Sequence, residues 1–281
     1  MIGSEAGPLS VHGDYARNSG TASNPNLWNG LCGLWMPALG IYGGKRLPNI
    51  VTGRDAVQGN AAALSYWQVV GAYSEGGAYS CIALGGSFGA AETYYDDISD
   101  LPDSLFAADF TVCGLIRMDP TPNAQNTLFS KDESTGGDGI SLRFLKSSNK
   151  FRVKIAGSNK DFSSAWTGGR FQVFFARRLG SSINVWFDGV KHATTNTSSS
   201  SAARTEDAAI GTRSSGESDR LFEGAVGMIA VWDRAIMEHE IQEISVDPFA
   251  IVRTSNRRRM WFVEPAAATG PHYYRWRRRY A

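Results

Sequence analysis

The chain has few cysteines and no long apolar run. Cys32, Cys81 and Cys113 are odd in number and lack metal-ligand spacing, which argues against a disulfide-rich scaffold and a cysteine zinc site. No stretch of about 20 apolar residues could span a bilayer, so we expect no membrane segment. The first residues show neither a basic start nor an apolar run, so we expect no signal peptide and synthesis in a cytoplasm.

The sequence also lacks the patterns that mark common catalytic sites. A strand of the type E-x-D-x-E would hold two carboxylates about 5.5 Å apart, but Glu217, Asp219 and Glu223 are spaced differently and lie in a glycine-flanked loop. No nucleophile-elbow motif is present. None of the four histidines has a metal-ligating or catalytic partner at a suitable spacing: His12, His192, His239 and His272. We therefore predict no catalytic residues.

Long helical periodicity is absent, whereas glycine is abundant and alternating apolar segments recur, which predicts an all-β chain. Phe151, Val153 and Ile155 alternate with Arg152 and Lys154, so one face of this strand should be buried. In the predicted strand near 183–187 the residues also alternate. Ile183, Val185 and Phe187 point one way, and Asn184 and Trp186 share the opposite face. The stretch from Ser198 to Ala203 is typical of a low-complexity surface loop.

The stretch from Ala208 to Ile244 organises the chain, because it predicts a strand, a polar loop, a second strand and a short helix. The second strand is apolar on both faces, so both should be covered. Its two predicted faces are Ala225, Gly227, Ile229 and Val231 on one side, and Val226, Met228, Ala230 and Trp232 on the other. The predicted helix places one stripe against the body and another toward solvent. The first stripe is Ile236, Glu240, Ile241 and Ile244; the second is Glu238, His239 and Glu243.

The formal charge of +1 hides an asymmetry. Between Arg253 and Ala281, eight arginines and one glutamate give +7, which leaves −6 for the remainder. Aromatic residues interleave with these arginines, which favours a protein interface; packing on the acidic body and nucleic-acid binding are the alternatives. The predicted partner-binding residues are Arg257, Arg258, Arg259, Trp261, Tyr273, Tyr274 and Trp276.

The order IGTRSSG, FEGAVGMIAVWDRAI and EHEIQEI resembles the closing segment of laminin-G-like, concanavalin-A-like jelly-roll domains. FQVFFARRLGSSINVWFDGVKHATT resembles a hairpin of that family, with Phe171 in place of the usual Trp. DPFAIVR resembles an ending that follows this domain in phage-encoded proteins. The resemblance implies an antiparallel two-sheet jelly-roll sandwich with a short capping helix near the C-terminus and extended terminal arms. We expect an N-terminal arm at 1–26, the jelly-roll domain at 27–246 and a basic aromatic tail at 247–281.

The resemblance implies a non-enzymatic phage virion structural protein, a surface decoration or fibre-type subunit made in the host cytoplasm. Its terminal arms would bind other virion subunits in a homo-oligomer, and its sandwich would contact a partner or a host surface glycan. Nucleic acid is a less favoured partner, and no membrane is expected. A free calcium-dependent lectin and a divergent glycan hydrolase are the alternatives.

Two sets of candidate ligand-binding residues follow. Trp166 and Trp186, with Asn184, would stack on and bind a sugar. No cofactor is expected other than Ca²⁺, which needs six to eight oxygen ligands and is bound at the rim of laminin-G-like domains. Asp132, Glu133 and Asp138, on an acidic loop, are the candidate calcium ligands.

Overall fold

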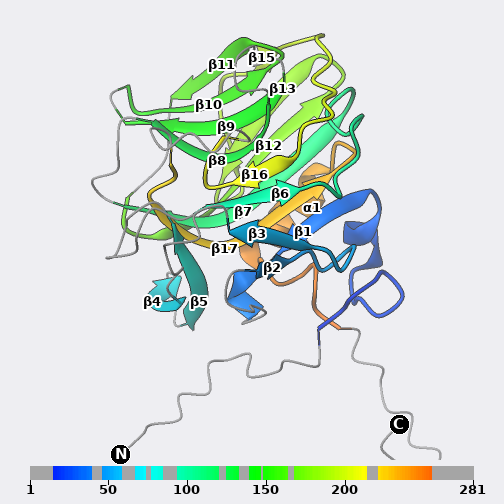
Figure 1. Ribbon diagram of the computed structural model, residues 1–281, viewed down its shortest axis with the longest axis vertical. Helices are drawn as coiled ribbons and strands as arrows, with labels where there is room; N and C mark the ends of the chain where they lie inside the picture. Colours follow the sequence, from blue (N-terminus) through cyan, green and yellow to red (C-terminus); the bar gives the residue numbers. More distant parts are fainter. Residues whose placement is uncertain are drawn as a thin grey trace, which may run out of the picture.

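Two antiparallel β-sheets packed face to face form the body of the protein (Figure 1). The computed structural model describes residues 15–39, 46–58, 67–73, 77–84, 94–119, 125–132, 139–146, 148–163, 168–213 and 221–254. Within these ranges the predicted all-β sandwich with a short helix near the C-terminus is confirmed. No helix in these ranges combines the length and apolar character that a bilayer span requires.

The larger sheet has nine strands. In spatial order its main path is β14 (Val190–Lys191), β13 (Ser182–Phe187), β12 (Phe171–Leu179), β7 (Phe110–Met118), β17 (Gly224–Trp232), β5 (Gly77–Leu84) and β4 (Trp67–Tyr73). Two further strands join it, β1 (Leu31–Trp35) beside β17 and β15 (Asn196–Thr197) beside β13. Strand β17 is therefore paired along its length by β7 on one side and by β5 and then β1 on the other.

The smaller sheet has eight strands. Their order is β11 (Ser158–Ser163), β10 (Lys150–Ile155), β9 (Ile140–Leu145), β8 (Gln125–Lys131), β16 (Ala208–Ile210), β6 (Tyr95–Ile98), β3 (Asp55–Gln58) and β2 (Arg46–Pro48). The described helices are the short 3-10 helices η1 (Pro25–Trp28) and η2 (Pro37–Leu39) and the α-helix α1 (Glu238–Val246).

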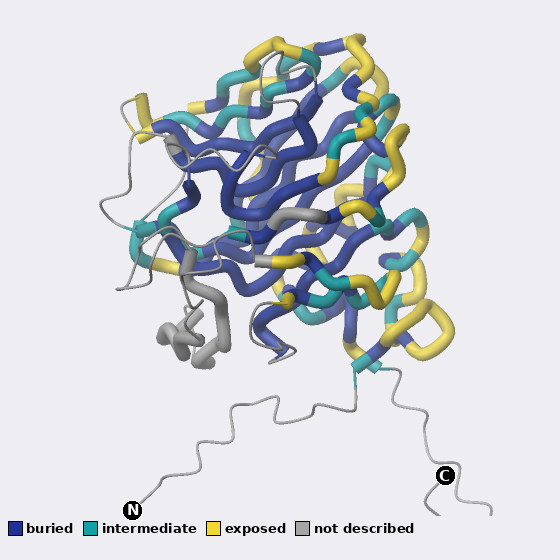
Figure 2. The backbone as a smooth tube through the Cα atoms, viewed as in Figure 1, coloured by how far each residue is buried: buried dark blue, intermediate teal, exposed yellow. Residues whose placement is uncertain are grey.

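The main core lies between the two sheets, where the inward residues of each strand meet (Figure 2). On β10 the inward residues Phe151, Val153 and Ile155 are fully buried, while Arg152 and Lys154 are partly exposed, as their alternation predicts. Phe151 contacts Phe174 and Phe187 of the facing sheet, with ring centroids 5.5 and 5.7 Å apart. Aromatic contacts across the sandwich therefore join the two layers.

A second core covers the outer face of the nine-stranded sheet. Trp232 of β17 lies there with Ile241 and Ile244 of α1, all fully buried. The Trp232 indole N–H donates a hydrogen bond to the Leu27 carbonyl oxygen of η1 at 2.7 Å. The prediction that β17 is covered on both faces is confirmed, and so is the buried stripe of α1.

The predicted faces of β17 are wrong at its start. Ala225 lies in the second core with Met228, and Val226 lies between the sheets with Ile229. The cause is a shift of register against β7 between Val226 and Met228, since a β-bulge inserts one residue and reverses the alternation. The extra residue is Gly227, whose added Cβ would approach Leu115 Cδ2 to 3.0 Å.

The described parts of the two terminal segments lie side by side at one end of the molecule (Figure 1). Tyr15 forms a β-bridge with Arg253, and the Ala16 N–H donates to the Val252 carbonyl at 2.7 Å. Trp28 Nε1 donates to the Ile251 carbonyl at 2.7 Å. Residues 15–26, assigned to the predicted arm, and 247–254, assigned to the predicted tail, are thus packed on the body and on each other.

Candidate functional site

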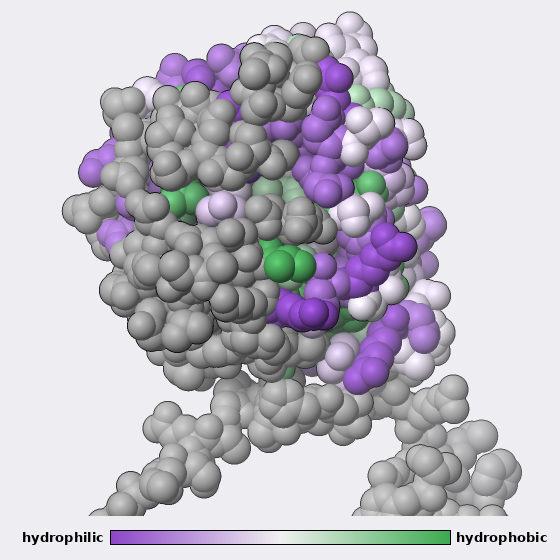
Figure 3. All heavy atoms as spheres, viewed as in Figure 1, coloured by the Kyte–Doolittle hydropathy of each residue, from purple (hydrophilic) through white to green (hydrophobic). Residues whose placement is uncertain are grey.

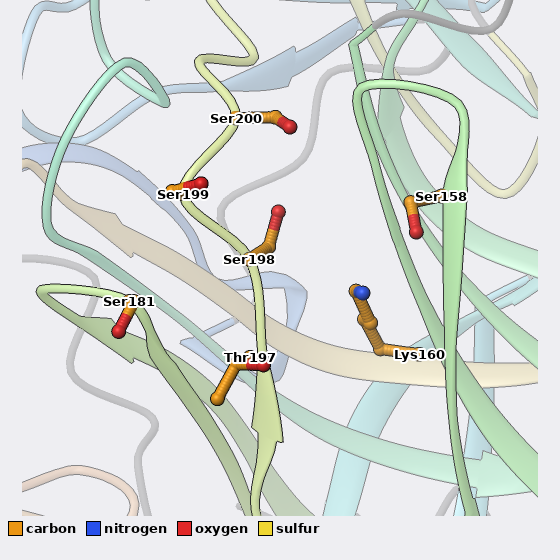
Figure 4. Close-up of a pocket in the computed structure, with 7 residues that line it drawn as sticks. All are labelled: Ser158, Lys160, Ser181, Thr197, Ser198, Ser199 and Ser200. Carbon is orange, nitrogen blue, oxygen red and sulfur yellow. The ribbon is translucent and has the colours of Figure 1, made fainter.

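The two sheets approach each other at one edge, where the edge strand β11 faces β15 across a hollow of about 460 Å³ (Figure 4). The Asn196 side-chain amide donates to the Asp161 carbonyl at 3.1 Å and ties the two strands together. The hollow is lined by Ser158, Lys160, Ser181, Thr197, Ser198, Ser199 and Ser200. All seven side chains carry a hydroxyl or an ammonium group, so the lining is mainly polar.

Strand β11 explains why a polar hollow opens beside an apolar core. Residues paired across two antiparallel strands share a face of the sheet. Phe162 pairs with Phe151 and is buried with it in the core, but Lys160 pairs with the buried Val153. Ser158 in turn pairs with the buried Ile155. The inward face of β11 therefore changes from apolar to cationic to hydroxylic toward the hairpin turn, and Lys160 and Ser158 turn toward the other sheet.

The opposite wall is held by main-chain hydrogen bonds. The Ser198 N–H donates to the Ser181 carbonyl at 2.8 Å, which closes the segment after β15 onto the β12–β13 turn. The buried Arg178 guanidinium donates to the carbonyls of Gly180 at 2.9 Å and Ser200 at 2.7 Å. These bonds fix both parts of the wall without using its hydroxyl groups.

The lining side chains themselves are available to a ligand. Within the described ranges, none of the seven makes a side-chain hydrogen bond or an ion pair. Figure 4 shows the Lys160 amino group and the hydroxyls of Ser158 and Ser198 directed into the space between the walls. Each hydroxyl can donate one hydrogen bond and accept two, and an ammonium donates three. Such a set suits a ligand rich in hydroxyl groups.

The predicted sugar-binding residues lie elsewhere. Trp186 is 1% exposed, and the expectation that it is exposed for sugar stacking is wrong. The reason is its cover: the Arg177 guanidinium lies 4.6 Å and the Lys191 ammonium 5.5 Å from its ring centroid, below α1. Asn184 is also buried and accepts a hydrogen bond from Thr195 Oγ1 at 2.8 Å. Trp166 lies outside the described residues.

Asp132 does not fit the calcium site predicted for it. Its carboxylate is 1% exposed and faces three cations, with Arg213 at 3.4 Å, Arg143 at 3.5 Å and Lys154 at 3.9 Å. Burial raises the pKa of this carboxyl and outweighs the opposing attraction of the three cations. A divalent cation would be repelled by the same three side chains. Glu133 and Asp138 lie outside the described residues, and among the residues that are described no group of three or more His, Cys, Asp or Glu side chains could hold a metal ion.

The end of the molecule that carries the terminal segments has a second hollow, of about 640 Å³. It lies between the N-terminal segment and the solvent-facing side of α1. The lining residues are Ser23, Asn24, His239, Gln242, Glu243, Val246, Asp247, Ala250 and Arg253. The predicted partner-binding residues Arg257, Arg258, Arg259, Trp261, Tyr273, Tyr274 and Trp276 follow this hollow in the chain and lie outside the described residues.

The first hollow, between β11 and β15, is called the serine hollow below, and the sequence analysis did not predict it. Its residues come from 158–160, 181 and 197–200, and the last of these ranges overlaps the stretch that the sequence predicts as a low-complexity loop. One local signal was available. Lys160 and Ser158 continue the alternation of Phe162, so two polar residues occupy positions that a core strand would fill with apolar ones.

A laminin G family model of the concanavalin A-like lectin/glucanases superfamily matches residues 92–242, more than half of the chain. No curated protein sequence matches the chain.

Solved structures of sialidases resemble the fold. Trypanosoma rangeli sialidase bound to 2,3-difluoro-KDN matches with a TM-score of 0.54 and 16% identity over 79% of this chain. The same enzyme with sialic acid gives a TM-score of 0.52 and 15% identity over 79% of this chain. NanB sialidase from Streptococcus pneumoniae gives 0.46 and 20% identity over 54% of this chain. The chain spans 33%, 33% and 26% of those proteins. At 16% and 15% identity, the likeness to the Trypanosoma rangeli enzyme concerns the fold alone.

Proposed function

We propose that this chain, which belongs to the concanavalin A-like lectin/glucanases superfamily, is a non-enzymatic subunit of a phage virion that contacts a host surface glycan. The serine hollow between β11 and β15 would receive the glycan. The terminal segments would attach the subunit to its neighbours in a homo-oligomeric particle.

The observation that carries the proposal is the uncommitted polar lining of the serine hollow. Several buried polar side chains elsewhere in the described fold are bonded, such as Thr111 with Ile236 and Arg234. In the hollow, six hydroxyls and one ammonium are held in place by their backbones with no partner in the described ranges. A pre-formed set of donors and acceptors binds a hydroxylated ligand with little loss of side-chain freedom.

The arrangement of the molecule supports attachment at one end and binding at the other. In Figure 1 the strands β11 and β15 lie at the end opposite to the described parts of the two terminal segments. Hydrophilic side chains line the right flank of the molecule in Figure 3. A subunit fastened through its terminal segments would therefore present the serine hollow outward.

Described carboxylates with structural partners favour binding over hydrolysis. Asp132 faces three cations, and Glu240 is held by both ends of the Arg234 guanidinium at 2.7 and 2.8 Å. Asp161 follows the lining residue Lys160 in the chain. Its carboxylate accepts two hydrogen bonds from Arg152, at 2.6 and 2.9 Å, on the other side of β11. Hydrogen bonds from arginine help to hold the pKa of Asp161 and of Glu240 below the usual range, whereas a general acid needs a proton to give.

A glycan array with the full chain tests the binding site. We expect wild-type protein to bind a subset of glycans and Ser199→Trp, which fills the hollow, to lose that binding at unchanged melting temperature. Ser148→Trp is the matched control, because Ser148 is an exposed serine in the turn at the other end of β10. Equal binding by wild type and Ser199→Trp, or none by wild type, would count against the serine hollow as a glycan site.

Mass spectrometry of purified phage particles, followed by imaging, tests the virion role. We expect the chain in stoichiometric amounts at an exposed position on the particle. Reducing-sugar release by the purified chain from a bound glycan would instead indicate a hydrolase.

A further inference from the structure

We infer that the glycan bound in the serine hollow is acidic, with its anionic group against Lys160 Nζ and its hydroxyls against the surrounding serines. This inference rests on the proposed function and names the ligand class of the same site.

The serine hollow has a cation and no acid in its lining. Lys160 is its one charged lining residue and forms no ion pair within the described ranges. The neighbouring acid Asp161 projects to the other face of β11, where it is bound by Arg152 and lies 3.6 Å from Lys150. Behind the opposite wall the Arg178 guanidinium donates to the carbonyls of Gly180 and Ser200, and the Asp109 carboxylate accepts the Gly180 N–H at 2.6 Å, so one charge of each sign lies there. The ammonium of Lys160 is therefore the charge that the lining itself presents, and it favours an anion.

The position of Lys160 makes that charge effective. The residue is half-buried on the inward face of an edge strand, and its partner Val153 is fully buried. A charge pair in such partly desolvated surroundings is stronger than one on an open surface, because less water screens it. A neutral sugar would satisfy the hydroxyls but would leave the ammonium with water alone.

The hydroxyl wall selects the rest of the ligand. Ser198, Ser199 and Ser200 come from the segment after β15 and face Ser158 and Lys160 across the hollow (Figure 4). An inorganic anion would need only the ammonium and one or two hydroxyls. Hydroxyls on both walls of a hollow of about 460 Å³ match a sugar-sized ligand that carries many hydroxyls of its own.

An inward charge on an edge strand also has a purely structural use, since it discourages pairing with another sheet edge. That use requires Lys160 alone. It gives no reason for six hydroxyl side chains around the ammonium or for a wall fixed by the bonds of Ser198 and Arg178. The two explanations differ in what Lys160→Gln changes: ligand preference in one, self-association in the other.

The experiment uses the full chain on an array in which each carboxylated glycan is printed beside its methyl ester and each sulfated glycan beside its unsulfated form. We expect wild type to bind at least one acidic glycan tenfold or more tightly than its neutral counterpart, with affinity that falls as salt rises. Lys160→Gln should remove that preference while changing neutral-glycan binding less than twofold. Lys160→Arg should restore most of it. Lys146→Gln, which removes the same charge from an exposed turn at the other end of β10, should have no effect.

Three results would overturn the inference. Equal binding of acidic and neutral partners by wild type would show that the charge is not used, while the glycan site itself would stand. An acid preference that survives in Lys160→Gln would place the anion elsewhere. Absence of binding to every glycan would overturn the proposed function together with the inference. Circular dichroism and melting curves of each variant confirm that the compared proteins are folded.

Discussion

Two polar regions of the molecule are built in opposite ways. At the terminal end the Arg234 guanidinium donates to the carbonyls of Asn29 at 2.6 Å and Asn26 at 3.0 Å and to both oxygens of Glu240. Glu240 Oε2 also accepts the Met237 N–H at 2.6 Å, which closes the first turn of α1. At the other end, the side chains of the serine hollow have no such partners in the described ranges.

The difference separates polar groups that hold the fold from polar groups that are left for a ligand. Buried polar atoms that are already bonded stabilise a structure and have nothing further to offer. Polar atoms held in place by their backbones but not bonded through their side chains add little to stability and are available for binding. Substitutions should therefore cost stability at the first kind of site and binding at the second.

The largest loss of stability is expected at Trp186. A Trp186 that served the ligand and not the fold would contradict the distinction between the two kinds of site. Trp186→Ala should lower the free energy of unfolding by about 4 kcal/mol, because it removes a buried ring below Arg177, Lys191 and α1. Urea denaturation measures this. Trp186→Phe, which keeps a ring, should cost less than half as much. Full stability of Trp186→Ala combined with lost glycan binding would contradict the structural role.

The next effect is expected at Arg234. Arg234→Met should cost about 3 kcal/mol, since it leaves the buried Glu240 carboxylate without its cation and two carbonyls without a donor. The control is Arg46→Met, whose ion pair with Asp55 at 3.2 Å is 69% exposed on the arginine side and should contribute less than about 0.5 kcal/mol. Similar costs for the two arginines in urea denaturation would show that the Arg234 contacts do not stabilise α1.

Acid should weaken the same contacts. Burial acts to raise the pKa of Glu240, but the hydrogen bonds from Arg234 and Met237 outweigh it and hold the pKa below its usual range. The stabilisation is therefore complete above the unfolded-state pKa of about 4.3 and is lost as pH falls through the lower folded-state value. Wild type should be more stable than Glu240→Gln at pH 7, and the gap in melting temperature should shrink toward pH 3. A gap that widens in acid would reverse the assignment.

The smallest stability effect is expected in the serine hollow. Lys160→Gln should change the free energy of unfolding by less than about 0.5 kcal/mol, because no bond to a described residue is lost. Equilibrium denaturation, with analytical ultracentrifugation on the same samples, measures stability and self-association together. A loss near 2 kcal/mol would place Lys160 among the residues that hold the fold. Increased self-association alone would support the edge-protecting use.

Local patterns predicted the buried faces well where the strand had no bulge and one face packed on the core. The alternation on β10 and the buried stripe of α1 both match the structure, since each depends on residues close in the chain. The predicted faces of Ala225 and Val226 on β17 were wrong, because strict alternation does not allow for the β-bulge at Gly227.

The candidate site was less predictable, because its parts are far apart in the sequence. Alternation correctly placed Trp186 opposite to Ile183 and Val185, but it could not show that α1 and Arg177 cover that face. The partners of Arg234 on the N-terminal segment lie 205 and 208 residues away. The serine hollow joins segments some 40 residues apart across the edges of two sheets.

Local patterns predicted an all-β chain, a helix near the C-terminus and the alternation on most strands, because period and turn chemistry are properties of neighbours, and the family resemblance supplied the two-sheet sandwich. Which of those faces are open follows from the packing of distant segments. Trp186 and Asp132 became interior residues, and Lys160 became the charge in the serine hollow. The physical reason is that exposure depends on what packs against a side chain, and in this protein that cover comes from distant parts of the chain.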